Sequence, residues 1–288
     1  GENTYEWTST EISTGLESSG SGNIEFIATN TGNSPIVTTV TVTPNFENGG
    51  VSNSGNPETF TITVNPVPQV ELIQNSIICA GEEVGEINFS TLNTGGTTTY
   101  AWTNDNPAIG LAASGIGDIP SFTAINNTLS TIVVTIEVTP TFENGGTSST
   151  GNPETFTITV NPGAQVDSVV DQVLCNGELT NDILFTTTNI DGTTTYAWTN
   201  DNPAIGLAAS GTGDIPSFTA INNTTSTIVA TIEVTPTYEN GGVTCAGNSE
   251  TFTITVNPDA QVDSVIDQVL CVGELTNDIL FTTTNIDG

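Results

Sequence analysis

The sequence repeats itself with a step of 96 residues, so that its 288 residues amount to three such lengths. Residues 97–110 recur without change at 193–206, and Cys79, Cys175 and Cys271 follow one another with the same step. Self-similarity at a fixed period indicates a tandem array in which each repeat is one structural unit. The repeat therefore limits the fold to something that about 96 residues can build.

The triplet Val-Asn-Pro, which ends at Pro66, Pro162 and Pro258, predicts where each repeat ends, because proline removes a backbone donor and interrupts a strand. With these ends, the sequence begins and finishes inside a repeat, and two interpretations fit this arrangement. We favour an excerpt from a longer array; the alternative is that the C-terminal strands of one molecule complete the N-terminal unit of the next by strand donation. The predicted units are 1–66 (the C-terminal part of a repeat), 67–162 and 163–258 (two complete repeats) and 259–288 (the N-terminal part of a further repeat).

Alternating hydrophobicity predicts β-strands. In residues 131–140, apolar side chains alternate with threonine and glutamate, and residues 155–160 show the same pattern. The run Glu-Asn-Gly-Gly at 143–146 is typical of a hairpin turn with residues at positive φ. Around seven short strands per repeat indicate an all-β fold of tandem immunoglobulin-like β-sandwiches, and the short proline-containing joints predict a semi-rigid rod.

One tryptophan occurs in each repeat, at Trp7, Trp102 and Trp198. We expect these side chains in the core, as a tryptophan on a middle strand of such a sandwich usually is. The alternative is that they form stacking platforms for sugar rings.

Composition excludes several functions. The chain has 32 acidic residues and no Lys, Arg or His, which gives a formal net charge of −32. Without cations it cannot neutralise phosphates, so we expect no nucleic-acid binding and no attraction to an anionic membrane, and no apolar run is long enough to insert into one. A general base such as His or Lys is also missing, so we predict that the protein is not an enzyme and uses no cofactor.

The four cysteines predict one disulfide. Cys175 and Cys245 form a single pair within one complete repeat, and no histidine is present to share a metal with them, so we expect them to be bonded. Ser149 stands where a partner of Cys79 would be, so we expect Cys79 to be unpaired, and the place that would pair with Cys271 falls beyond the sequence. A disulfide implies an oxidising, extracellular setting.

Three motifs together resemble a known family. They are Cys-x-Gly-Glu near the start of a repeat, Tyr-Ala-Trp-Thr-Asn-Asp-Asn in its middle and Thr-Phe-Thr-Ile-Thr-Val-Asn-Pro at its end. The whole chain resembles the PKD-like, immunoglobulin-fold repeats of giant cell-surface gliding adhesins of Bacteroidota (SprB-like). The resemblance implies type IX secretion, a filament on the cell surface, contact with outer-membrane gliding and secretion machinery, and attachment to surface polysaccharide through other regions of the protein.

The resemblance also implies O-glycosylation at Asp-Ser-apolar sites, for which Ser168 and Ser264 are the candidates. Calcium is a weaker hypothesis, because carboxylates that recur between repeats could converge on a hard cation, although no dedicated calcium motif is present. The weak candidates are Asp105, Asp118, Glu143, Asp201, Asp214 and Glu239, and we expect no metal site overall.

We therefore predict the structural stalk of a repetitive adhesin filament, whose partners are the neighbouring repeats of the same chain. It would project a surface-binding end from the cell and serve gliding or attachment. Two rival functions remain: an array of carbohydrate-binding modules, and a passive matrix or surface-layer polymer assembled by strand donation.

Overall fold

A computed structural model describes residues 1–285 of the chain, and nearly all of its regular structure is β-sheet. The helical elements among these residues are three single turns of 3₁₀-helix, η1 (Ile12–Thr14), η2 (Pro107–Ile109) and η3 (Pro203–Ile205). The all-β class and the tandem immunoglobulin-like sandwiches predicted from the sequence are confirmed. The three main sheets follow one another in sequence order.

The first sheet is antiparallel and has the order β2-β1-β3-β4, with β5 also paired to β3. Its long strand β3 pairs with β5 through its first half and with β4 through its last residues, while β1 covers the other edge. The strands are β1 (Glu2–Ser9), β2 (Ser19–Ser21), β3 (Ile36–Asn48), β4 (Val51–Ser54) and β5 (Glu58–Val64).

The second sheet has the order β6-β13-β11-β8-β9, with β12 paired to β11. A two-stranded sheet of β7 and β10, continued by a bridge between Ile87 and Ile119, lies in the same stretch of chain. The strands are β6 (Ser76–Cys79), β7 (Glu83–Val84), β8 (Thr97–Asn104), β9 (Ser114–Ile116), β10 (Phe122–Thr123), β11 (Ile132–Asn144), β12 (Thr147–Thr150) and β13 (Glu154–Asn161).

The third sheet repeats the same plan as β14-β19-β17-β15-β16, with β18 paired to β17. Strand β14 pairs with β19 in parallel, with Gln172 beside Ile254 and Cys175 beside Asn257. The strands are β14 (Gln172–Cys175), β15 (Thr193–Asn200), β16 (Ser210–Thr212), β17 (Ile228–Asn240), β18 (Val243–Ala246) and β19 (Glu250–Asn257).

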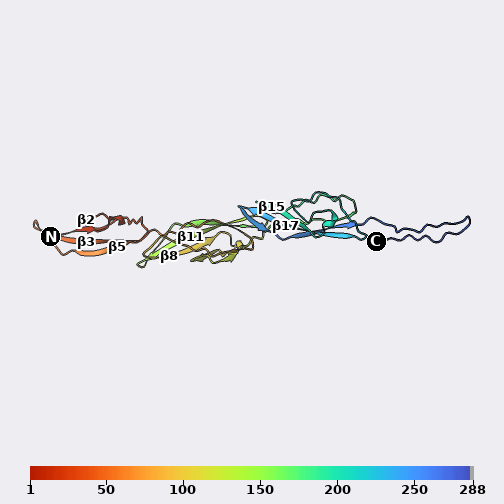
Figure 1. The fold of residues 1–288 in the computed structure, drawn as a ribbon. Coiled ribbons are helices and arrows are strands. Elements are labelled where there is room, and N and C mark those ends of the chain that lie inside the picture. The colour runs from red at the N-terminus through yellow and green to blue at the C-terminus, as the bar shows by residue number, and fades with distance from the viewer. Residues whose placement is uncertain (286–288) are drawn as a thin grey trace. The chain divides into compact units, whose positions relative to one another are not determined.

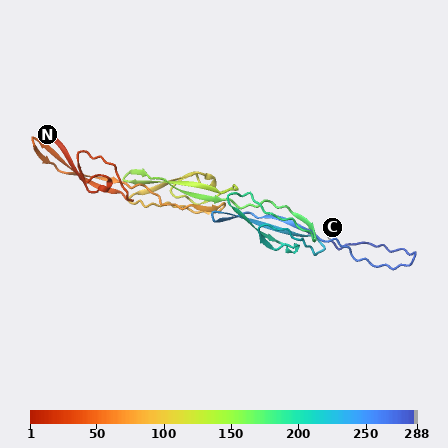
Figure 2. The ribbon, with the colours of Figure 1, turned by 90° about the horizontal axis from the view of Figure 1, so that it is seen from above.

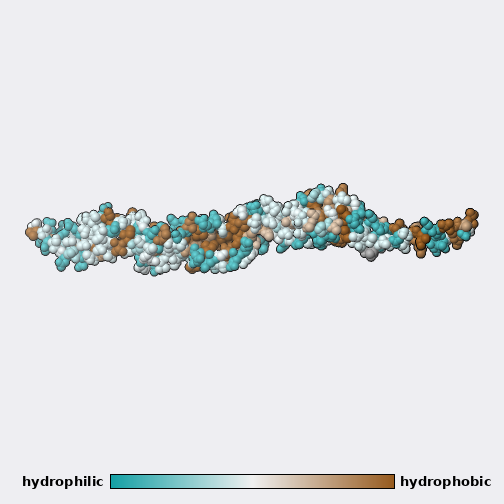
Figure 3. Space-filling model, in the orientation of Figure 1, coloured by the Kyte–Doolittle hydropathy of each residue, from teal (hydrophilic) through white to brown (hydrophobic). Residues whose placement is uncertain are grey.

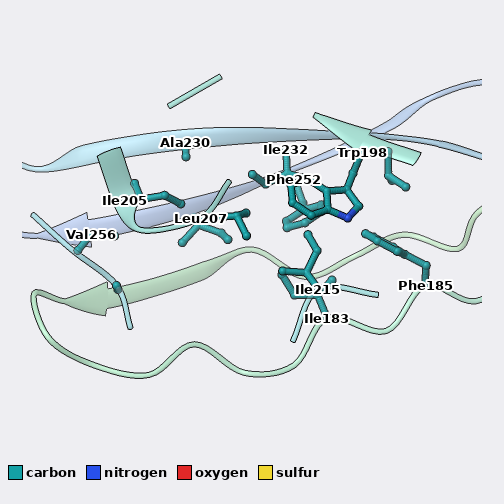
Figure 4. Packing of buried hydrophobic residues seen from close by; sticks show 13 residues of the cluster. Ile183, Phe185, Trp198, Ile205, Leu207, Ile215, Ala230, Ile232, Phe252 and Val256 are labelled. Carbon is teal, nitrogen blue, oxygen red and sulfur yellow. The ribbon is translucent and has the colours of Figure 1, made fainter. Parts of the chain in front are cut away.

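The core of the third repeat lies between this sheet and a less regular layer held by the bridges Leu179–Thr219 and Ile183–Ile215. Trp198, Ile232 and Phe252 project from the sheet toward Ile183 and Ile215 (Figure 4). Alternation of apolar and polar residues along β17 and β19 places one face of each strand in this core, as the period of a strand requires.

The described chain forms two compact units. The first contains Gly1–Ser76, Glu82–Ala124 and Val133–Thr159, and the second contains Ile77–Gly81, Ile125–Ile132 and the residues from Val160 onward. The second unit thus contains the whole third sheet together with three short segments of the preceding repeat (Ile77–Gly81, Ile125–Ile132 and 160–162), and those segments contribute to the joint described below.

Residues 259–285 contain no strand. The segment runs out and back as two extended arms (Figures 1 and 2), held by bonds such as that from the Asp263 N–H to the Thr282 carbonyl at 2.8 Å. The last three residues of the predicted unit 259–288 lie outside the described residues.

Candidate functional site: the joint between repeats

Two asparagines meet at the joint between the second and third repeats. Asn161, from the Val-Asn-Pro triplet at the end of β13, is fully buried, and Asn240 ends β17. The Asn161 side-chain amide donates to the Asn240 carbonyl at 3.0 Å, and the Asn240 amide donates to Asn161 Oδ1 at 3.2 Å and to Thr131 Oγ1 at 2.9 Å. The Asn161 amide both donates and accepts, while Asn240 donates through its side chain and accepts through its backbone carbonyl, which satisfies polar groups that burial would otherwise penalise.

The same pair occurs one repeat earlier, within the first unit. Asn144, at the end of β11, donates to Asn65 Oδ1 at 2.9 Å, and Asn65 donates back to the Asn144 carbonyl at 3.4 Å. In both pairs the partners are 79 residues apart. The asparagine of one Val-Asn-Pro triplet thus binds the asparagine of the Glu-Asn-Gly-Gly turn in the following repeat.

A tyrosine extends this network in the second unit. Tyr238 is fully buried; its hydroxyl lies 2.8 Å from the Ile190 carbonyl, to which it donates, and 3.1 Å from Thr131 Oγ1. A Cβ built on Gly192 would overlap the Tyr238 ring, so this glycine is needed for the close approach. The backbone adds a further bond at the joint, from the Ile190 N–H to the Leu129 carbonyl at 3.0 Å.

The turn after β17 also belongs to the joint. Gly241 and Gly242 have φ of 62° and 79°, which a two-residue hairpin turn with positive φ requires. A Cβ on Gly241 would overlap the side chain of Ile77, from the strand that carries Cys79. The Glu-Asn-Gly-Gly motif at 143–146 predicted a turn, and the Val-Asn-Pro triplet predicted a repeat end. That the two motifs contact each other was not predicted, although their constant separation of 79 residues was the available signal.

A disulfide crosses the joint and corrects the predicted pairing. Cys79, at the end of β6, is bonded to Cys245 on β18, with a Cα–Cα distance of 5.5 Å, and both side chains are buried. The predictions that Cys245 pairs with Cys175 and that Cys79 is unpaired are therefore wrong. Cys175 is exposed and free, as is Cys271.

Strand geometry explains the correction. Cys175 lies at the Asn257 end of β19, and this end is level with Ile228, where β17 begins. Cys245 lies opposite Tyr238, near the other end of β17. Ten residues of extended chain separate the two levels by roughly 33 Å, so a bond within the repeat cannot form, whereas the preceding repeat brings Cys79 to the Tyr238 end.

The tryptophans are covered rather than presented to solvent. Trp7, Trp102 and Trp198 are 8%, 4% and 7% exposed. A Cβ on Gly20, Gly115 or Gly211, their respective partners on the neighbouring strand, would overlap the indole ring. A ring sandwiched in this way cannot offer a face to a sugar, which disfavours a stacking platform.

The carboxylates considered for calcium are dispersed. Asp105 and Asp201 accept the N–H groups of Thr135 and Thr231 at 2.9 and 2.7 Å. In the same way Asp118 and Asp214 accept the N–H groups of Phe89 and Phe185 at 2.7 and 2.9 Å, while Glu143 and Glu239 lie on β11 and β17. Within residues 1–285 no three His, Cys, Asp or Glu side chains gather in a metal-binding group, and the four aspartates bind backbone N–H groups instead.

Two tyrosines of the sheets have perturbed acidity. Burial raises the pKa of Tyr100 and Tyr196, and nearby carboxylates (Asp118 for Tyr100, Asp167 for Tyr196) raise each pKa further. The chain contains no lysine or arginine that could offset this effect.

The candidate modification sites are accessible. Ser168 and Ser264 are both exposed, each next to the aspartate of its Asp-Ser motif. Asp167 accepts a hydrogen bond from the Thr186 hydroxyl at 2.6 Å, and Asp263 accepts one from Thr282 at 2.7 Å. None of the helices in the described residues has the length and apolar character needed to cross a membrane.

The sequence of the third repeat matches a known family. Residues 172–260 match the PKD-like domain family. The matched stretch begins with β14 and extends just past β19, so it spans the third sheet and the Cys245 side of the joint. The second repeat has the same strand order and shares the run 97–110 with residues 193–206.

Several solved structures are distantly similar to this chain. The three N-terminal domains of the highly immunogenic outer capsid protein (Hoc) of bacteriophage RB49 are 12% identical, with 90% of this chain and 89% of that chain covered and a TM-score of 0.39. Human protocadherin-24 EC1-2 is 12% identical over 67% of this chain and 99% of that chain, with a TM-score of 0.35. The insect immune protein hemolin is 14% identical over 77% and 56%, with a TM-score of 0.28. Because these TM-scores are low, we draw no conclusion about function from the similarities. A search of curated proteins found no match.

Proposed function

We propose that this chain is a stalk segment of an extracellular adhesive filament, in which tandem immunoglobulin-like repeats hold a surface-binding region away from the cell. The observation that carries the proposal is the joint. Asn161, Asn240 and Thr131 connect one repeat to the next by partly buried hydrogen bonds, and the Cys79–Cys245 disulfide connects them covalently. A joint of this kind resists bending and separation, which a stalk needs and a set of independent binding domains does not.

The repeats 1–66, 67–162, 163–258 and 259–288 are in this proposal the successive pieces of the stalk, arranged as a semi-rigid rod. The disulfide supports an oxidising location outside the cytoplasm. The net charge of −32 keeps neighbouring stalks apart. Absence of Lys and Arg leaves no site for trypsin-like proteases, which suits an exposed fibre.

The finer assignment rests on the resemblance of the repeat motifs to SprB-like gliding adhesins of Bacteroidota. On that basis the filament would be exported by type IX secretion, would contact the gliding machinery of the outer membrane, and would attach to polysaccharide through other regions. Ser168 and Ser264 would carry O-linked glycans, and their exposure supports this. We propose no catalytic role for the chain.

Two experiments test the proposal. Antibodies raised against residues 67–258 should label unpermeabilised cells as filaments; labelling confined to the cell interior would overturn the location. The recombinant chain should not bind a panel of surface polysaccharides, since its tryptophans are buried. Saturable binding to one polysaccharide would instead favour an array of carbohydrate-binding modules.

A further inference from the structure

The first and last strands of the third repeat lie side by side and run in the same direction, with Gln172–Cys175 (β14) beside Ile254–Asn257 of β19. The chain enters the repeat through β14 and leaves it through β19, after which it continues into residues 259–285, the narrow stretch with brown and teal surface at the right of Figure 3. Tension on the chain therefore pulls the two strands in opposite directions along their own axes. The hydrogen bonds of a parallel pair run across that direction, so they have to break together rather than one after another.

Two further hydrogen bonds close this strand pair at its ends. Before β14 begins, the Thr253 N–H donates to Asp171 Oδ1 at 2.6 Å. After β14 ends, the Asn176 N–H donates to the Asn257 carbonyl at 2.9 Å. We call β14, β19 and these two bonds the terminal-strand clamp of the third repeat.

The second repeat is closed in the same way, since its first strand β6 pairs with its last strand β13. The Thr157 N–H donates to Asn75 Oδ1 at 2.8 Å. The Ala80 N–H donates to the Asn161 carbonyl at 2.9 Å. All four positions lie 96 residues before those of the third repeat, so the terminal-strand clamp is a feature of the repeat and not of one sequence.

The Cys79–Cys245 disulfide offers tension a second route. Cys79 is the last residue of β6, and Cys245 lies on β18, which precedes β19. A covalent path therefore leads from β6 through the two sulfur atoms to β18 and β19, and it leaves out residues 80–244. Strands β13 and β14 both lie within the omitted stretch. Tension that follows the disulfide thus does not pull β13 against β6 or β14 against β19.

We propose that this disulfide decides which part of the chain bears tension. While Cys79 and Cys245 are bonded, tension passes from β6 to β18, and residues 80–244 stay folded under force. Once the bond is reduced, tension crosses each complete repeat from its first strand to its last, and the terminal-strand clamp becomes the element that resists unfolding. The inference deepens the proposed stalk function and rests on it for its biological meaning, whereas the route of the force follows from the fold and the disulfide.

Constant-force stretching of the full chain, with Cys175→Ser and Cys271→Ser, tests the route of the tension. In the bonded chain there should be no unfolding steps of about 300 Å, the length that a repeat of 96 residues releases. Dithiothreitol reduces the disulfide to two thiols and is itself oxidised to a cyclic disulfide, and after this reduction two such steps should appear. Steps of this size in the bonded chain would overturn the proposal.

The clamp is tested by matched variants of the reduced chain. Asp171→Ala removes the bond from the Thr253 N–H, and at one constant force it should speed the unfolding of one of the two steps about tenfold. Asp201→Ala is the control: Asp201 is also exposed and accepts one strand N–H, that of Thr231 at 2.7 Å, but it lies outside the clamp. Asn75→Ala should speed the other step, because it removes the equivalent bond of the second repeat.

The outcomes separate the clamp from a general loss of stability. In urea, Asp171→Ala and Asp201→Ala should destabilise the protein to a similar extent, because each removes one hydrogen bond of the same kind. Under force, only Asp171→Ala should speed unfolding. Equal acceleration by the two variants would show that the clamp does not resist the force and would overturn the proposal. Labelling of cells with antibodies tests the stalk function separately, and neither result would change it.

Discussion

At the residue scale, the two asparagines of the joint are neutral amides in a chain whose side-chain charges are all negative. Asn240 contributes donors to Asn161 and Thr131, and its neighbour Glu239 carries a negative charge. A carboxylate could accept hydrogen bonds at this position but could not donate them. The joint therefore depends on the donor groups of an asparagine amide, which an acidic residue at position 240 would not supply.

We expect Asn240→Asp to destabilise the protein by about 1–3 kcal/mol, because it removes two donated hydrogen bonds and leaves Asn161 Oδ1 and Thr131 Oγ1 with fewer partners. Urea unfolding of the 288-residue chain measures this change. Asn48→Asp is the control, since Asn48 is the equivalent residue of the first repeat and is exposed. Equal effects of the two substitutions would argue against the joint.

A second prediction at this scale concerns acidity. Tyr100 and Tyr196 should ionise at higher pH than free tyrosine, because burial and nearby carboxylates raise the pKa of both. Since the folded pKa lies above the unfolded one, their contribution is constant at neutral pH and folding stability is lost as the pH rises above about 10. Ultraviolet titration follows the ionisation of the tyrosines. Each of the variants Tyr100→Phe and Tyr196→Phe should lack one of the phenolate transitions that occur at the highest pH in the wild type. Loss of a transition at lower pH instead would contradict the assignment.

At the element scale, each of the three main sheets is organised around one strand of thirteen residues, β3, β11 or β17, which pairs with three neighbours. The alternation in residues 131–140 and the Glu-Asn-Gly-Gly turn were sufficient to predict the strand and its hairpin, because both signals are local. The parallel β14–β19 pair and the Cys79–Cys245 bond were not predictable, because they join segments that are distant in sequence. The prediction of a Cys175–Cys245 bond was wrong because it did not consider the length of β17, which keeps the two cysteines apart.

The contact between a strand tryptophan and a glycine can be tested directly. Gly211→Ala should destabilise the protein by about 1–3 kcal/mol, because the new methyl group would overlap the Trp198 ring in a closely packed core. Gly163→Ala is the control, since nothing lies within 4 Å of a Cβ at that position. Thermal unfolding compares them, and an unchanged melting temperature for Gly211→Ala would contradict the described packing.

At the scale of the whole molecule, repulsion between carboxylates opposes every contact that the chain makes. With a net charge of −32 and no basic side chain, no ion pair between side chains can offset it. Apolar burial, hydrogen bonds and the disulfide must therefore hold the repeats together. The absence of ion pairs between side chains follows from the composition alone, because it depends on which residues are present and not on their arrangement.

The melting temperature should consequently rise when NaCl is increased from about 10 mM to about 500 mM, because salt shortens the range of the repulsion. KCl at the same ionic strength should have the same effect. A comparable rise with micromolar calcium would instead indicate a specific site and would contradict the dispersed arrangement of the carboxylates.

Single-molecule stretching of the chain by its two ends tests most directly whether consecutive repeats are tied together. Cys175 and Cys271 would be replaced by Ser, so that the only disulfide is Cys79–Cys245. The bond removes a loop of 166 residues from the path of the force, so reduction should lengthen the fully extended chain by about 550–600 Å. Equal lengths before and after reduction would show that the two repeats are not joined and would contradict the stalk described here.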